Sequence, residues 1–318
     1  MAAADLVVMT WNVENLFRPA ADVEPDAKET YERKLDYLAA TIHAVAPDAL
    51  AVQEVGGPDA VEDLRAALGA DWHVAVSQHG DGRGIRVAVL SPHEVTVEAD
   101  VVDFPSGALR GVPDVDHGSL TRLGRGALRV LVDAGGPGLR VLTTHLKSKL
   151  LTYPGNRRFP RSENERARGA GLATLRRTAE AVALRVHLNA VMAAAAAGGQ
   201  PAMPTVLCGD LNDGVDAVTT VLLEGPTDGD PNRPDKGDPV RLYNLGRMLP
   251  PQRAYSRIYE GRGELIDHVM VSRDLRLRVA AVDALVDDIG SITASLRARE
   301  KAVVPDHAPV VARFTGTA

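Results

Sequence analysis

The chain has 318 residues, of which 45% are hydrophobic and 25% are charged, close to the proportions of an average globular protein. This composition excludes collagen-like, coiled-coil and disordered chains, and a chain of this length buries a sizeable core without disulfides or structural metals. Its 36 Lys and Arg against 42 Asp and Glu give a net charge of −6. The chain therefore lacks the basic excess of a protein held on nucleic acid by long-range charge.

The first apolar run, which begins at Leu6, and the cysteine content indicate where in the cell the protein is found. Thr10 and Asn12 interrupt the run, and no basic start precedes it, so a secretory signal is not expected. The longest apolar stretch, around Ala190–Ala197, is much shorter than the roughly 18 residues that span a bilayer. Cys208 is the only cysteine, which excludes an intramolecular disulfide and a cysteine-rich zinc site and fits a reducing compartment. We therefore expect a cytoplasmic protein with no membrane insertion.

Taken in chain order, eight short apolar runs rich in Val and Leu predict buried strands. These runs are Leu6–Thr10, Ala49–Gln53, Val87–Leu90, Ala127–Val132, Leu139–Thr144, Thr205–Cys208, Leu265–Val271 and Val310–Phe314. Apolar spacings of three and four predict helices over Tyr31–Val45, Ala60–Leu68 and Leu172–Ala197. The helices interrupt the strands irregularly, which favours an α/β fold with two packed sheets and helices outside over an open βαβα repeat.

Three segments predict loops because they concentrate Gly, Pro, Asp and Asn: Gln78–Gly84, Asp103–Gly118 and Gly225–Pro239. The last has the composition of a surface insertion or of a linker between domains. The strand-like segments after it carry polar residues of the same kind as those before it. We therefore expect a single domain over residues 1–318.

Polar residues that can bind metals lie at or near the ends of the apolar runs. They are Asn12, Glu54, His145, Asp210, Asn212, Asp267, Asp306 and His307. Because ligands bind at strand ends in layered α/β proteins, we expect these side chains to converge on one pocket. Each residue alone also fits an ordinary structural role, such as a turn or a cap, so the prediction depends on the whole set.

Two pairs in this set illustrate both interpretations. Asp210 and Asn212 lie two residues apart, so in an extended segment their side chains project the same way and can hold one ligand. The structural alternative is an Asx turn. For Asp306 and His307 the structural alternative is that the aspartate caps a turn while the histidine packs in the core.

The residue types indicate a hard metal ion. Carboxylates such as Glu54 and Asp306, with the amide oxygen of Asn12, suit Mg²⁺ or Mn²⁺, which leave coordination positions for phosphate and water. Zinc is disfavoured because HExxH and CxxC spacings are absent. Histidines and an aspartate beside such an ion can supply the proton transfer and charge neutralisation that hydrolysis of a phosphate ester requires.

Six segments in order along nearly the whole chain, TWNVENLF, AVQEV, TTHLKS, CGDLND, LIDHVMVS and PDHAPV, resemble the endonuclease/exonuclease/phosphatase family, which includes deoxyribonuclease I-like enzymes. The resemblance implies a four-layer α/β/β/α sandwich, in which two packed mixed sheets have helices outside and the site lies at one edge. It also implies a metal-dependent phosphoric ester hydrolase, with Glu54 as the main ligand of Mg²⁺ or Mn²⁺, Asn12 beside it and Asp306 as a further ligand.

The resemblance also implies catalytic roles. Asp210 would orient or deprotonate the attacking water, and Asn212 would donate a hydrogen bond to a phosphate oxygen. His307, aligned by Asp267, would stabilise the developing charge or protonate the departing oxygen, and His145 is the second histidine. In-line attack on phosphorus needs a positioned nucleophile, neutralised oxygens and a stabilised leaving group, and these groups can supply them.

The nature of the phosphate ester is less defined by the sequence. The THLKS segment resembles deoxyribonuclease I-like, sphingomyelinase-like and some phosphatase members, which disfavours an abasic-site repair enzyme. Arg157–Arg177 holds seven arginines and two glutamates, and its default interpretation is a solvated helix face, with a rim that receives a polyanion as the alternative. Lys147 and Lys149 are candidate clamps for the substrate, and Arg86 is a candidate phosphate contact.

Three functions remain open from the sequence. The first is a phosphodiesterase or nuclease that hydrolyses phosphodiester bonds with metal-activated water, with nucleic acid as a candidate partner. The second is a phosphomonoesterase, or a phosphodiesterase for a small phosphorylated metabolite or lipid head group, favoured by the acidic balance. The third is a family member without catalysis, disfavoured because none of the eight expected residues is missing. Aromatic residues make up only 4%, which leaves little material for base stacking, and we expect Trp11 and Trp72 in the core.

Overall fold

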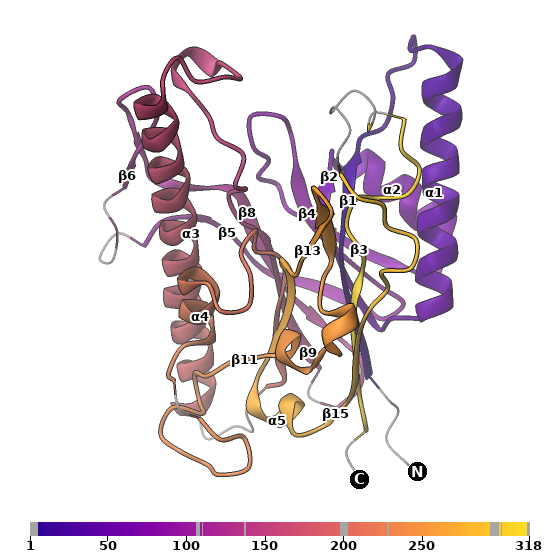
Figure 1. Cartoon of the computed structure of the whole chain (residues 1–318). Coiled ribbons are helices and arrows are strands. Elements are labelled where there is room, and N and C mark those ends of the chain that lie inside the picture. Colours follow the sequence, from indigo (N-terminus) through magenta and orange to yellow (C-terminus); the bar gives the residue numbers. More distant parts are fainter. Residues whose placement is uncertain are drawn as a thin grey trace.

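The computed structural model describes residues 6–105, 109, 111–136, 138–197, 203–227, 229–292, 299 and 301–316. Parts of the expected loops Asp103–Gly118 and Gly225–Pro239, and the first five residues of the chain, lie outside the described residues. Two six-stranded sheets pack face to face, and helices cover their outer faces (Figure 1). The α/β/β/α sandwich implied by the resemblance is confirmed.

The first sheet is mixed. Its strands, in spatial order, are β15 (Val279–Ala284), β16 (Val310–Phe314), β1 (Leu6–Leu16), β2 (Ala49–Val55), β4 (Arg86–Ser91) and β3 (His73–Val76). Strands β1 and β2 run parallel, and every other neighbouring pair is antiparallel. The parallel pair brings the carboxyl ends of β1 and β2 to the same end of the sheet.

The second sheet repeats this plan. Its spatial order is β11 (Tyr243–Asn244), β14 (Asp267–Val271), β10 (Thr205–Asp210), β9 (Leu139–His145), β8 (Arg122–Val132) and β5 (Val95–Asp103). Strands β9 and β10 are parallel, and the other pairs are antiparallel. Two further pairs lie outside the sheets: β6 (Val112–Pro113) with β7 (Ser119–Leu120), and β12 (Arg257–Tyr259) with β13 (Arg262–Glu264).

The helices divide between the two outer faces. Helices α1 (Pro25–Val45) and α2 (Pro58–Leu68) cover the first sheet, and α3 (Glu163–Ala197) and α4 (Val218–Glu224) cover the second (Figure 1). The remaining helical turns are short: α5 (Arg273–Arg276), η1 (Pro154–Asn156), η2 (Leu245–Met248) and η3 (Pro251–Arg253). Of the helices that the structure describes, none has the combined length and hydropathy that a bilayer crossing requires.

Alternation along the central strands produces three buried layers of side chains. In β10, Val206 packs between the sheets, whereas the next residue, Leu207, packs against the α3 side. In β1, Val8 faces the other sheet and Met9 faces α1 and α2. Successive side chains point to opposite faces of the sheet, and both faces are covered. The sequences of these strands are therefore nearly continuous apolar runs.

The eight predicted strands and three predicted helices are present; the strand Val310–Phe314 has the predicted bounds, and the other elements have different bounds. Helix α3 begins at Glu163, nine residues before the predicted start at Leu172. The prediction missed its first turns because they are polar and largely solvent-exposed and lack an apolar period. Helix α1 begins six residues before Tyr31, with proline in its first turn, where a missing N–H costs nothing. The prediction of a strand from Leu265 was wrong by two residues, since β14 begins at Asp267.

The sequence patterns missed strands at the sheet edges. Strands β3, β5 and β15 are edge strands, and each is largely half-buried or exposed. A strand covered on fewer sides has no need of a continuous apolar run, so it lacks the pattern by which the central strands were predicted.

Candidate functional site

Strand register places three of the expected residues side by side. In the second sheet, Asp210 pairs with His145 on β9 and with Asp267 on β14. Residues directly opposite one another on neighbouring strands have side chains within contact distance. All three residues are at most 3% exposed, so the sheet carries a row of buried titratable groups at one end.

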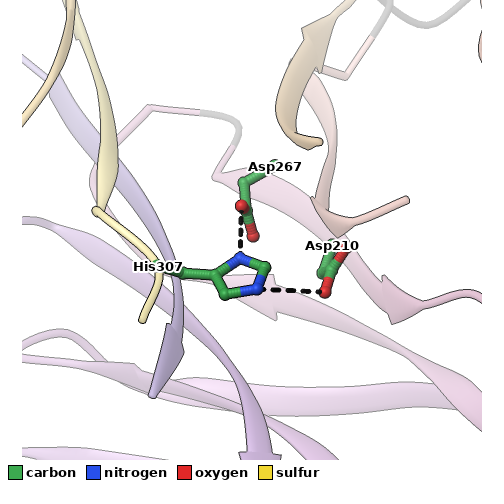
Figure 2. Close-up of side chains that lie close together, drawn as sticks. All are labelled: Asp210, Asp267 and His307. Atoms are coloured by element: carbon green, nitrogen blue, oxygen red, sulfur yellow. Dashed lines mark hydrogen bonds and ion pairs between the residues drawn. The ribbon is translucent and has the colours of Figure 1, made fainter. Parts of the chain in front are cut away.

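His307 completes this row from the other sheet, since it precedes β16 (Figure 2). Its Nδ1 lies 2.7 Å from Asp267 Oδ2, and its Nε2 lies 4.0 Å from Asp210 Oδ2. The residue is 4% exposed. The structure therefore brings His307 together with the aspartate that was expected to align it, and places the ring between two carboxylates.

Asp210 is the centre of the polar network. Its Oδ2 lies 3.2 Å from Nε2 of His145 and accepts a 3.0 Å hydrogen bond from Nδ2 of Asn12 on β1. His145 Nδ1 is buried and has no hydrogen-bond partner among the described residues. Asn12, expected beside the metal, is thus joined by its amide nitrogen to Asp210, while its Oδ1 accepts the N–H of Glu14 at 3.0 Å.

The charges of this network reinforce one another. Burial acts to lower the pKa of His307, but the negative charges of Asp267 and Asp210 and the hydrogen bond to Asp267 outweigh it and raise that pKa to about 10. Burial acts to raise the pKa of Asp210, but His145, His307 and Asn12 hold it well below its usual range. The raised pKa of His307 favours an imidazolium at neutral pH, which lies beside the ionised Asp210 and is hydrogen-bonded to Asp267.

Asn212 lies in the site in an unexpected conformation. Its backbone N–H donates to Asp210 Oδ1 at 2.9 Å, and its φ is +56°. This is the Asx turn that the sequence offered as the structural alternative, so the interpretation of an extended segment was wrong. The turn aims Nδ2 at the carbonyl oxygen of Leu146, 3.1 Å away, which leaves its second amide hydrogen for another acceptor.

Glu54 lies at an irregularity between β2 and both of its neighbours, with a φ of +64°. Its Oε2 accepts the N–H of Asn15 at 3.1 Å. Burial acts to raise its pKa, but His145, Arg125 and His307 lower it below its usual range. The break in register turns the side chain out of the strand and leaves an ionised carboxylate, half-buried, at the end of the sheet.

Asp306 is held through its backbone. Its N–H donates to Glu14 Oε2 at 3.0 Å, and the same carboxylate forms an ion pair with Arg299. Lys34, which is buried, donates to the carbonyl oxygen of Glu14 at 2.5 Å. Glu14 therefore connects β1, α1 and the segment that carries Asp306 and His307.

The donor set fits a hard divalent cation. Glu54, Asn12 and Asp306 offer carboxylate and amide oxygens, and Glu54 is ionised, as metal binding requires. A second group, Asp210, Asp267 and His307, has ligand-type atoms within 4.8 Å of one another. In that group the ring nitrogen Nδ1 of His307 already lies 2.7 Å from Asp267 Oδ2, so this nitrogen is not free to bind a cation.

Three residues that sequence reasoning missed support the row. Ser256 Oγ donates to Asp267 Oδ2 at 2.6 Å and accepts the backbone N–H of Asp267 at 3.2 Å. Trp11, expected only in the core, donates from Nε1 to the carbonyl oxygen of His307 at 2.8 Å. Arg125 donates to the carbonyl oxygen of Leu146 at 3.2 Å. Each acts through a residue distant in sequence, so no local motif identifies it.

The candidate clamp residues have partners within the chain. Arg86 donates to the carbonyl oxygens of Gly56 and Gly84, and Lys147 donates to that of Leu150. Lys149 forms a 2.9 Å ion pair with Glu264. These contacts give Arg86 and Lys147 structural roles and place Lys149 against β13.

The arginine-rich segment is mostly paired with acids. Arg157, Arg166, Arg176 and Arg177 form ion pairs with Glu165, Glu163, Glu180 and Asp213, respectively. Arg158, Arg161 and Arg168 are exposed, and their guanidinium groups have no carboxylate partner among the described residues. Most of the segment therefore fits the default interpretation of a solvated and internally paired helix face.

Comparison with known proteins gives a family and a fold. The model of the Endonuclease/Exonuclease/phosphatase family matches residues 9–295. A truncated TDP2 from Caenorhabditis elegans is similar in structure, with 16% identity, 98% of each chain covered and a TM-score of 0.56. The human Nocturnin catalytic domain with bound sulfate is also similar in structure, with 16% identity and a TM-score of 0.55. The similarity covers 98% of this chain and 95% of the Nocturnin chain.

A mannosyl-6-phosphatase from Bacteroides thetaiotaomicron has the same fold, with 14% identity, 96% of this chain and 98% of that one covered, and a TM-score of 0.57. No curated protein sequence matches the chain. At these identities the structural similarities establish the fold alone.

Proposed function

Because the chain belongs to the endonuclease/exonuclease/phosphatase family, we propose that it is a phosphodiesterase of the nuclease type. Membership of this family makes it a metal-dependent phosphoric ester hydrolase. The observation that carries the proposal is the row of His145, Asp210, Asp267 and His307, which joins both sheets and pairs a charged imidazole with two carboxylates.

Glu54, Asn12 and Asp306 would hold the cation, which we propose to be Mg²⁺ or Mn²⁺. When bound, the cation supplies charge neutralisation at the phosphoryl oxygens. Glu54 would be the principal ligand, as the family resemblance implies, and its lowered pKa keeps it ionised for this role. Asn12 orients the site from β1 by donating to Asp210, and the hydrogen bond from Asp306 to Glu14 fixes the third ligand.

The remaining residues handle protons and orientation. Asp210 is ionised, so it can accept a hydrogen bond from the attacking water and orient its lone pair toward phosphorus. His307 is protonated and can donate to the departing oxygen or to a charged phosphoryl oxygen, while Asp267 fixes its ring orientation. Asn212 offers its free amide hydrogen to the phosphate, and His145 lies beside Asp210 as a second hydrogen-bonding group.

We also propose that residues 1–318 form one catalytic domain and that the protein works in the cytoplasm. One continuous family match over residues 9–295 supports the first statement, and the single buried cysteine supports the second.

The proposed function is tested by phosphate-ester hydrolysis with wild type and Glu54→Ala in Mg²⁺, Mn²⁺ or EDTA. The substrates are bis-p-nitrophenyl phosphate, p-nitrophenyl phosphate, plasmid DNA and RNA. We expect cleavage of the diester and of nucleic acid that needs the cation and falls at least about 10²-fold in Glu54→Ala, because the main ligand is lost. Glu62→Ala, on the exposed face of α2, is the matched control and should keep full activity.

Two outcomes would redirect the assignment. Hydrolysis of the monoester alone would replace the nuclease proposal by a phosphomonoesterase for phosphorylated metabolites. Cation-independent cleavage, or full activity in Glu54→Ala, would show that the oxygen set does not bind the catalytic metal.

A further inference from the structure

Residues at the start of the β12–β13 hairpin contact Asp267 and His307. Ser256, just before β12, bonds Asp267 through its hydroxyl, and its carbonyl oxygen accepts the N–H of Ala308 at 2.6 Å. The next residue, Arg257, forms an antiparallel bridge with His307. Bridged residues of this kind have Cα atoms about 4.5–5.5 Å apart, so Arg257 lies at the edge of the reacting centre.

The guanidinium of Arg257 has no anionic partner among the described residues. Its Nε is buried and makes no hydrogen bond within the part of the chain that the structure describes. Other basic side chains nearby have carboxylate partners: Lys149 forms an ion pair with Glu264, and Arg253 forms ion pairs with Asp283 and Asp287. A buried, unpaired guanidinium donor carries a free-energy penalty, which an anionic ligand bound there would remove.

Tyr259 lies on the same strand two residues on, and its ring is close to that guanidinium. The Arg257 Cζ lies 5.3 Å from the ring centre, a cation–π distance. Tyr259 is 45% exposed, which leaves ring surface open to a ligand. The strand thus presents a planar cation and an open aromatic ring side by side, next to His307.

We propose that Arg257 and Tyr259 form a binding site for the part of the substrate beside the scissile phosphate, with Arg257 binding a second phosphate and Tyr259 stacking a base. Planar guanidinium groups bind phosphate through paired donors, and exposed aromatic rings stack bases without sequence preference. The substrate class is therefore a nucleotide or oligonucleotide that carries a phosphate beyond the one hydrolysed. This assignment rests on the proposed function.

Equilibrium binding in EDTA tests the site independently of the cation and of turnover. Calorimetry compares thymidine 3′,5′-bisphosphate with thymidine 5′-monophosphate for wild type, Arg257→Ala and Arg262→Ala. We expect wild type to prefer the bisphosphate by about tenfold or more, and Arg257→Ala to lose that preference. Arg262, exposed on the same hairpin, is the matched control, and its variant should keep the preference. Tyr259→Ala should weaken both ligands about tenfold.

Kinetics add a second readout in Mg²⁺, with p-nitrophenyl thymidine 5′-phosphate and its 3′-phosphorylated form. Arg257→Ala should lower kcat/KM about 10- to 100-fold more for the form with the second phosphate. Equal affinities in wild type, an unchanged preference in Arg257→Ala, or the same loss in Arg262→Ala would overturn the assignment. A retained binding preference without hydrolysis by wild type would contradict the proposed function and leave this site intact.

Discussion

Two of the eight residues predicted for the site hold a left-handed backbone without being glycine. Glu54 and Asn212 have φ values of +64° and +56°, a conformation that costs about 1–3 kcal/mol for such residues. Hydrogen bonds that involve Asn15 and Asp210 hold them there. In this backbone conformation the Glu54 side chain reaches the N–H of Asn15, and the Asn212 side chain reaches the carbonyl oxygen of Leu146.

At the scale of single residues, the sequence predicted the members of the site better than their contacts. His145, Asp210, Asp267 and His307 are brought together as expected. The conformation of Asn212 was not predictable, because the sequence Asp210-Leu211-Asn212 is compatible with both an Asx turn and an extended segment. The supporting residues were missed because each one acts through a partner brought close only by the fold.

His187 on α3 offers a prediction about acid stability. Its Nε2 lies 2.7 Å from Nη1 of Arg129, and burial together with that positive charge lowers its pKa to about 4. The fold therefore favours the neutral ring, so stability contributed by His187 is fully present above about pH 6.5 and is lost as pH falls toward 4.

The variant His187→Gln should flatten this dependence, because glutamine can accept the same hydrogen bond without binding a proton. Denaturant unfolding at pH 7.5 and pH 4.5 should show a smaller stability difference than in wild type, by on the order of 1 kcal/mol. His43→Gln, on the exposed side of α1, is the control for losing a histidine. An unchanged difference in His187→Gln would refute the account.

At the scale of elements, the site depends on how closely β9 and β10 approach. Gly209 precedes Asp210 and has a φ of +140°, and a Cβ there would lie 2.0 Å from the carbonyl oxygen of Thr144. Only glycine permits this approach, which sets Asp210 opposite His145. The pairing of Asp210 with His145 therefore depends on the close approach of β9 and β10.

Gly209→Ala should therefore force the strands apart. We expect a loss of more than about 2 kcal/mol in the free energy of unfolding, from strain and a steric clash, and a large fall in activity. Gly82→Ala is the matched control, since a Cβ at Gly82 meets nothing within 4 Å, and its effect should stay within about 0.5 kcal/mol. Equal effects of the two substitutions on thermal and denaturant unfolding would contradict this reading of the strand pair.

At the scale of the whole molecule, the site exists only when the two sheets are docked. Asn12, Glu54 and His307 come from the first sheet, whereas His145, Asp210 and Asp267 come from the second. The apolar layer between the sheets fixes their spacing, so the catalytic geometry depends on packing that no single segment contains.

This dependence sets how much of the fold the sequence could predict. Central strands such as β10 and β16 are buried on both faces and read as apolar runs, so they were predicted. Edge strands such as β5, and the first turns of α3, face solvent and carry no such pattern. The irregular alternation of strands and helices indicated two packed sheets with helices outside, and the family resemblance added the order of the four layers.

The central claim is that Asp267 and His307 act as one unit across the two sheets. It is tested most directly by the rate of bis-p-nitrophenyl phosphate hydrolysis in Mg²⁺ for Asp267→Asn, His307→Gln and the double variant. Each single substitution should lower kcat about 10²-fold, and the double variant should lose no more than His307→Gln alone, because Asp267 acts only through the ring. Losses that multiply to about 10⁴-fold would show two independent contributions and contradict the account.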